Sequence, residues 1–463
     1  MSLFRKKDIS KLLEEKEKGN QLKRALGAFD LTMLGIGAII GTGIFVLTGT
    51  AAATKAGPAL ILSFIIAGLA CAFAALCYAE FASTVPVSGS VYTYSYATLG
   101  ELVAWVIGWD LILEYLLAVS TVSVGWSGYF QKLLSGFGIH LPPALASVDQ
   151  PGGVFNLPAF LIVLLITWLL SRGVKESARL NNIMVVIKVT VVLLFIAVSI
   201  WYVKPANWTP FMPFGWSGVF GGAAFVFFAY IGFDAVATAA EEVRNPKRDL
   251  PIGIIASLAI CTLLYIVVAA LMTGIVPYPK LNDPAPISLV LQAAGQNWVA
   301  GFVSLGAILG ITTVLLVMMY GQTRIFFAMS RDGLLPKVFS TVHPKYRTPY
   351  VCTWLVGVVA AVLGGFFPLN KLAELVNIGT LAAFTLISIG VIVLRYKQPD
   401  LPRAFRVPFV PVVPLLSAGF CLFLMTQLPF DTWAAFLIWL VIGCIIYFGY
   451  SRQHSTLNQP TNN

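Results

Sequence analysis

Long apolar stretches follow one another along almost the whole chain, separated by short polar breaks. A helix needs about 20 apolar residues to cross the hydrocarbon core of a bilayer, which is roughly 30 Å thick. Stretches of this length, bounded by charged residues, proline or clustered glycine, predict twelve transmembrane helices. The predicted spans are residues 28–54, 58–82, 99–130, 156–171, 181–203, 217–240, 251–275, 297–328, 349–367, 372–394, 407–427 and 432–450.

The composition supports a membrane protein and argues against a water-soluble one. Hydrophobic residues make up 58% of the 463 residues and charged residues 11%, against roughly 25% charged in an ordinary soluble domain. The six cysteines lie in or beside apolar stretches without a paired or metal-ligand spacing, so we expect core residues and no metal site. The charged start of the chain and the long first apolar stretch predict that no signal peptide is cleaved.

The net charge is +10, which in a soluble protein would suggest a nucleic-acid partner. If the N-terminus is cytoplasmic, 24 of the 30 basic residues fall in cytoplasmic segments, five lie on the opposite side and Lys188 lies within a span. Basic residues are enriched in the cytoplasmic loops of membrane proteins, and this accounts for the charge without nucleic acid. We therefore expect a multi-pass protein of the plasma (cytoplasmic) membrane with both termini in the cytoplasm.

Glycine is clustered in the middle of the first predicted span, where residues 35–43 include four glycines. Each glycine weakens a helix by about 1 kcal/mol relative to alanine, so we expect the helix to break here. The pair Gly37 and Gly41 also fits close packing of two helices through small residues, and this alternative stays open. A nucleotide-binding loop is excluded, because such a loop follows a strand and opens a helix in water.

The sixth predicted span combines an aromatic cluster, a glycine and an acid at residues 227–234. If the first ten helices form two five-helix halves, spans one and six are equivalent, and interrupted segments at matching places are typical of transporter substrate sites. A broken helix exposes N–H and C=O groups that lipid cannot satisfy. These groups suit an amino acid, because its carboxylate accepts from N–H groups and its ammonium donates to carbonyls.

Five motifs stand along the chain: GAIIGTGIF at 37–45, PVSGSVY at 86–92, FFAYIGFD at 227–234, AAEEVRNPKRDLP at 239–251 and SRDGLLP at 330–336. With these motifs the sequence resembles the amino acid/polyamine/organocation superfamily, and within it the cationic amino acid transporter branch. The resemblance covers residues from about 25 to about 350.

The resemblance implies an all-α integral membrane protein with 12 transmembrane helices and a leucine-transporter-like fold. In this fold two five-helix repeats of inverted topology are followed by two further helices, and helices 1 and 6 are broken. The corresponding parts of this chain are a cytoplasmic arm at 1–27, repeats at 28–203 and 217–394, additional helices at 407–450 and a cytoplasmic tail at 451–463.

The resemblance also implies where a substrate binds. Its carboxylate would meet Thr42 and Gly43, and its amine would meet backbone carbonyls of both breaks. Phe228 would be the aromatic gate over the substrate, although a packed aromatic in a Phe-rich helix is an alternative. The implied substrate-binding residues are Ile39, Ile40, Gly41, Thr42, Gly43, Phe228, Ala229 and Ile231.

Ionisable residues inside spans cost about 2.5 to 3.5 kcal/mol on insertion scales, so each needs a partner or a function. Lys188 resembles the fifth-helix lysine that proton-coupled members place between helices 1, 5 and 8, where sodium-coupled relatives bind an ion. We expect Lys188 to take up and release the coupling proton, and we expect no sodium site; a permanently charged or snorkelling lysine is the alternative. Glu114 and Asp234, with Asp110, are candidates for a proton path, although hydroxyl groups could instead bind Glu114.

The expected lining of the site is mostly neutral, with Thr312, Thr313 and Met318 in the eighth span and Ser123 in the third. This lining favours small or apolar amino acids over cationic ones. Met318 and Ser123 are the candidate specificity residues, and Met318 is expected to limit the depth of the pocket. Core packing is the alternative for Met318.

These features predict a proton-coupled symporter of L-amino acids, such as alanine, that works by alternating access. An exchanger (antiporter) and a cationic (Arg/Lys) amino acid permease of the same fold are the alternatives. An enzyme is not expected, because the spans carry no nucleophile and base pair and no metal-ligand set. No cofactor is expected, and the partners are the substrate and the lipid bilayer. Oligomeric state, a small membrane subunit and a lipid ligand are left open.

Overall fold

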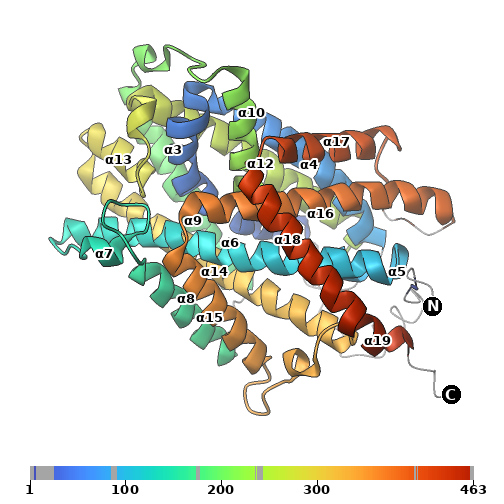
Figure 1. The fold of residues 1–463 in the computed structure, drawn as a ribbon. Helices are drawn as coiled ribbons and strands as arrows, with labels where there is room; N and C mark the ends of the chain where they lie inside the picture. The colour runs from blue at the N-terminus through green and yellow to red at the C-terminus, as the bar shows by residue number, and fades with distance from the viewer. Residues whose placement is uncertain are drawn as a thin grey trace.

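The computed structural model describes residues 5–6, 26–84, 91–173, 178–234, 236, 243–400, 403 and 405–458, and these form helices without a β-strand. Figure 1 shows their arrangement. The helices are α2 (Ala28–Ile39), α3 (Thr48–Ala51), α4 (Leu60–Thr84), α5 (Val91–Thr98), α6 (Glu101–Gly136), α7 (Pro143–Ala146), α8 (Leu157–Ser171), α9 (Ala178–Ser199), α10 (Gly215–Val226), α12 (Pro246–Ile275), α13 (Pro286–Ala293), α14 (Asn297–Arg331), α15 (Tyr350–Phe366), α16 (Leu369–Lys397), α17 (Val412–Thr426), α18 (Phe430–Ile446) and α19 (Arg452–His454).

Seven helical stretches of the described chain are long and apolar enough to cross a membrane. Five shorter apolar helices, α2, α8, α10, α15 and α17, lie in other predicted spans. Large apolar side chains such as Leu263, Phe302 and Ile438 are exposed, as expected where lipid rather than water surrounds a helix. The protein is therefore an all-helical, multi-pass membrane protein.

The observed helices differ from the predicted spans mainly at their ends. α6 continues to Gly136, beyond the predicted end at residue 130, and α14 continues to Arg331. The helix α5 precedes α6 and was not predicted as a separate element. The prediction counted only the apolar residues that a bilayer requires, whereas a helix can continue into the water on either side.

The two spans predicted to break lie against a central group of helices. α6 packs against α14, α16, α15 and α8, and Figure 1 shows α6, α14 and α16 crossing the middle of the molecule. α14 also contacts α2, while α16 contacts α10 and the short helix that follows it. The first and sixth spans are therefore held by neighbours that belong to different parts of the sequence.

Both ends of the described chain meet at the start of α6, around the buried carboxylate of Glu101. Oε1 of Glu101 accepts from the Tyr447 hydroxyl at 3.0 Å and pairs with the Arg5 guanidinium at 3.3 Å. Oε2 accepts from the Ser455 hydroxyl at 2.6 Å and from the Tyr96 hydroxyl at 3.1 Å. We call the side of the molecule that carries this cluster the termini side.

Candidate functional site

The first span is interrupted within residues 40–42. α2 ends at Ile39, and Ile40 has an extended backbone with φ −74° and ψ 105°. The chain then forms a π-helical turn at Gly43–Leu47. The predicted break is present, and the glycines also serve close packing. A Cβ on Gly37 would lie 2.6 Å from the Val185 side chain of α9.

The sixth span is interrupted directly after α10. Residues Phe227–Tyr230 form a 3₁₀ turn, and Ile231 is extended with φ −62° and ψ 135°. Gly232 follows with φ +119°, a conformation that favours glycine, and its Cβ position lies 2.7 Å from the Ala38 carbonyl oxygen. Of the last six residues of this predicted span, 235–240, the described residues include only Val236.

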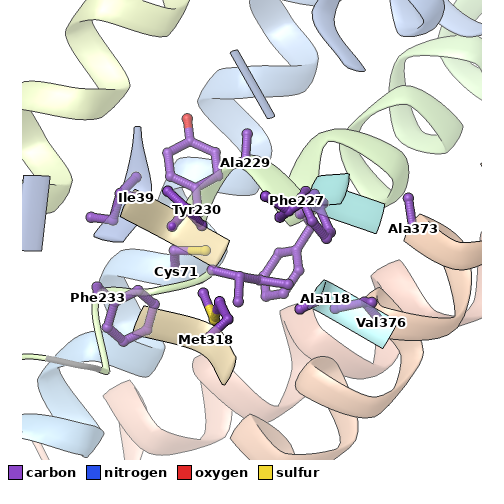
Figure 2. Close-up of a cluster of buried hydrophobic side chains, with 14 of the residues drawn as sticks. Ile39, Cys71, Ala118, Phe227, Ala229, Tyr230, Phe233, Met318, Ala373 and Val376 are labelled. Atoms are coloured by element: carbon purple, nitrogen blue, oxygen red, sulfur yellow. The ribbon is translucent and has the colours of Figure 1, made fainter. Parts of the chain in front are cut away.

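The two breaks touch each other in the interior of the protein. A Cβ on Gly43 would lie 2.3 Å from the Ala229 Cα, so only glycine allows this backbone approach. Figure 2 shows Ile39 of the first break in one buried cluster with Ala229 and Tyr230 of the second. The structure thus brings together two segments that lie about 190 residues apart in the sequence.

Side chains from other helices bind the carbonyl groups at these breaks. The Tyr265 hydroxyl of α12 reaches the Ile39 oxygen at 3.0 Å and the Ala229 oxygen at 2.7 Å. The Tyr129 hydroxyl of α6 donates to the Phe45 oxygen at 2.7 Å. Sequence reasoning missed both tyrosines. A polar group inside an apolar span needs a hydrogen-bond partner, and this rule is the signal that would have singled them out.

Lys188 is fully buried between three helices. Its ammonium group donates to the carbonyl oxygen of Gly37 on α2 at 2.6 Å. Its aliphatic stem lies against Gly310 of α14, where a Cβ would come within 2.9 Å of Lys188 Cγ. Lys188 of α9 is therefore in contact with both the first and the eighth span.

A cavity of about 430 Å³, which we call the inner cavity, reaches the second break from the termini side. Its inner lining includes Glu114, Ile231, Asp234 and Met318, all four of which were candidates from the sequence. The Tyr115 hydroxyl donates to Asp234 Oδ2 at 3.2 Å within this lining. Towards the termini side the lining is cationic, with Arg324, Arg331 and Arg347.

A second cavity of about 590 Å³, which we call the outer cavity, opens on the opposite side. It reaches Val46 and Thr50, just beyond the first break. Its lining is mixed and includes the polar side chains of Lys132, His140 and Asp149. Burial raises the pKa of Asp149 above its ordinary value, while the hydrogen bond from the Leu369 N–H acts in the opposite direction. Gly43 lies three residues before Val46 of this cavity, and Ala229 lies two residues before Ile231 of the inner cavity.

Other candidate residues face neighbouring helices. The methyl group of Thr42 lies 2.4 Å from the Cβ position of Gly125 on α6, and Thr42 is buried. Gly41 packs against Val314 of α14. The Ser123 hydroxyl donates to the Ser120 carbonyl at 2.7 Å, and its oxygen lies 2.5 Å from the Cβ position of Gly364 on α15. Ser123 thus faces α15, and its specificity role stays a prediction.

Two further observations concern charge and metal chemistry. Asp110 is buried beside Gly379 of α16, and its Oδ1 has no hydrogen-bond partner within the described residues. Within the same residues, no group of three or more His, Cys, Asp or Glu side chains is arranged to hold a metal ion.

Residues 26–450 match the family model described as amino acid permease. The chain is 65% identical to the branched-chain amino acid permease BcaP of Bacillus subtilis (strain 168), over 99% of each chain. It is 61% identical to the methylthioribose transporter of the same strain, over 99% of this chain and 100% of that protein. Cationic amino acid transporter 4, vacuolar, of Arabidopsis thaliana is 41% identical over 86% of this chain and 68% of its own length.

Proposed function

The chain belongs to the amino acid permease family of the amino acid/polyamine/organocation superfamily, and we propose that it is a proton-coupled symporter of L-amino acids. Membership of this family makes it a transporter and not an enzyme. Its proposed substrates are small or apolar neutral amino acids such as alanine, and it works by alternating access.

One observation carries the proposed amino acid site. The carbonyl oxygens of Ile39 and Ala229, from different breaks, converge so closely that the single hydroxyl of Tyr265 reaches both. Converging carbonyls form an acceptor pair for an ammonium group. The carboxylate then binds the backbone at Thr42 and Gly43, and Phe228 acts as the gate. The proposed binding residues are Ile39, Ile40, Gly41, Thr42, Gly43, Phe228, Ala229 and Ile231.

The proposal includes a topology and a conformational state. Twelve crossings, with repeats at 28–203 and 217–394, place both termini on one side of the membrane. The excess of basic residues places that side in the cytoplasm. The cavity lined by Ile231 and Met318 then opens to the cytoplasm, and the contact of Gly43 with Ala229 separates it from the outer cavity. This arrangement corresponds to an inward-facing form in which Met318 limits the depth of the pocket.

Lys188 is the proposed proton carrier. A buried ammonium group bonded to the Gly37 carbonyl couples the charge of the lysine to the backbone that leads into the first break. Release of the proton would remove this charge and weaken that bond. Glu114 and Asp234 line the inner cavity and are the proposed path for the proton to the cytoplasm.

Two relatives favour further substrates. The relative with 65% identity is described as a branched-chain amino acid permease, and the relative with 61% identity as a methylthioribose transporter. Branched-chain amino acids are apolar and extend the same proposed class. Methylthioribose is the second candidate, because a neutral molecule with hydroxyl groups can also donate to converging carbonyls.

Purified protein in liposomes tests these proposals. We expect labelled alanine to accumulate when an inward proton gradient is imposed, and unlabelled leucine to compete more strongly than arginine. Accumulation without a gradient, but only against amino acid loaded inside, would instead identify an exchanger. Uptake of labelled methylthioribose with no uptake of any amino acid would assign the second candidate and exclude the first.

A further inference from the structure

Asn377 lies on α16 and is fully buried beside α10, the first half of the sixth span. Its side-chain Nδ2 donates to the Ala224 carbonyl oxygen at 2.9 Å and to the Phe225 carbonyl oxygen at 2.9 Å. Both acceptors belong to α10, which ends at Val226 immediately before the 3₁₀ turn. One amide group therefore uses both of its hydrogens on two successive carbonyls at the end of a broken helix.

The chemistry of a helix end explains why a donor is needed there. The last four carbonyls of an α-helix have no partner within that helix, and Ala224 and Phe225 lie among the last four residues of α10. In water these oxygens would be hydrated, but lipid offers no donor. Asn377 supplies two N–H groups from a neighbouring helix, so the break does not leave these carbonyls unsatisfied.

The orientation of this amide is determined by its surroundings. Exchanging the positions of Oδ1 and Nδ2 would place Oδ1 against two carbonyl oxygens, and a carbonyl oxygen cannot donate a hydrogen bond. In the observed orientation Oδ1 has no partner within the described residues, so the two bonds to α10 are the only ones of this side chain that the described structure contains. Asn377 is thus placed to serve the helix end.

We propose that Asn377 is a positioning residue of the substrate site. It holds the end of α10 so that Phe227–Tyr230 stay in the 3₁₀ turn and do not continue the α-helix. This turn carries Phe228 and Ala229, and Ala229 presents its carbonyl to the converging pair described above. Loss of the two bonds loosens the end of α10 and moves these residues. The inference rests on the proposed amino acid site, but its first readout does not require a substrate.

The test uses Asn377→Leu, which is similar in size and has no donor, and Asn377→Asp, which keeps the shape and donates one hydrogen only when protonated. The matched control is Ser388→Ala on the same helix. Ser388 is also buried and polar, but it bonds Phe384 and Ser417, away from the break. Each full-length protein is purified in detergent and must be monodisperse in gel filtration.

Hydrogen–deuterium exchange over residues 224–231 is the first measurement. We expect exchange at least about threefold faster in Asn377→Leu than in the wild type, an intermediate rate in Asn377→Asp and no change in Ser388→Ala. Alanine binding is the second measurement, with a dissociation constant at least about tenfold higher in Asn377→Leu. If Asn377→Leu does not fold, the Asp variant decides on the same two readouts.

Unchanged exchange in the Asn377 variants would overturn the proposal, as would faster exchange with unchanged alanine affinity. If the wild type bound no amino acid, the proposed substrate would be wrong. Faster exchange confined to the Asn377 variants would then still support the role of Asn377 at the break.

Discussion

The ammonium group of Lys188 lies 2.6 Å from the carbonyl oxygen of Gly37, three residues before the break in the first span. A buried charge in this position is bonded directly to the backbone that leads into the proposed substrate site. Because bonds to an ionised donor are shorter and stronger than neutral ones, a change in the protonation state of Lys188 would alter how tightly α9 holds α2.

Replacing Lys188 tests whether this charge couples transport to protons. We expect Lys188→Ala to lose proton-driven accumulation of alanine in liposomes while keeping counterflow exchange, because exchange needs no net proton release. Lys188→Arg should do the same, since arginine stays charged. Lys280→Ala, which changes an exposed lysine, is the control. Undiminished accumulation in Lys188→Ala would refute the coupling role.

Gly43→Ala tests the contact between the two breaks. The added methyl group would lie 2.3 Å from the Ala229 Cα, where no flexible side chain can move aside. We expect alanine affinity, measured by calorimetry, to fall at least about tenfold. Gly301→Ala in α14 is the control, because its methyl group would meet nothing within 4 Å and alanine favours the helix by about 1 kcal/mol. Equal affinity in both variants would mean that the close approach is not needed for binding.

Met318→Ser tests the limit on substrate size. Met318 lines the inner cavity beside Ile231, so a shorter side chain should let longer and cationic amino acids such as arginine compete for alanine uptake. Met319→Ser is a neighbouring control, since the Met319 methyl group lies against Gly357 of α15 instead. A substrate profile identical to the wild type would remove Met318 from the specificity determinants.

Ser455→Ala tests the cluster at the start of α6. This change removes a 2.6 Å hydrogen bond to the buried Glu101 carboxylate, and hydrogen bonds to charged groups contribute about 1.5–3 kcal/mol. We expect a lower melting temperature in detergent, measured by intrinsic fluorescence. Thr426→Ala removes an exposed hydroxyl bond within α17 and should leave the melting temperature unchanged. A shift of the same size in both variants would argue against the cluster as a stabilising contact.

Much of the fold follows from local features of the sequence. The apolar stretches predict where helices lie, because each crossing must satisfy its own backbone and bury about 20 apolar residues in lipid. The glycine cluster at residues 35–43 predicts the first interruption, since glycine weakens a helix wherever the helix stands. The aromatic cluster, glycine and acid at residues 227–234 predict the second at the equivalent place in the sixth span. Family membership also follows from these motifs, and the comparisons confirm it.

The partners of the breaks could not be predicted in this way. Tyr265 and Asn377 lie on helices whose apolar pattern gives no sign of which carbonyls they reach. Ser123 shares a helix with Glu114, yet it faces α15 while Glu114 lines the inner cavity. The direction of each side chain depends on the rotation of its helix against several neighbours, and no local pattern contains that rotation.

By itself the sequence determined the helical membrane class, the places where two helices are interrupted and the family, because these depend on the hydrophobicity and backbone preferences of nearby residues. Only the tertiary structure decided that Gly43 meets Ala229, that Lys188 bonds Gly37 and that Asn377 binds the end of α10. Each of these contacts joins residues that are far apart in the chain, so it exists only once the helices have packed.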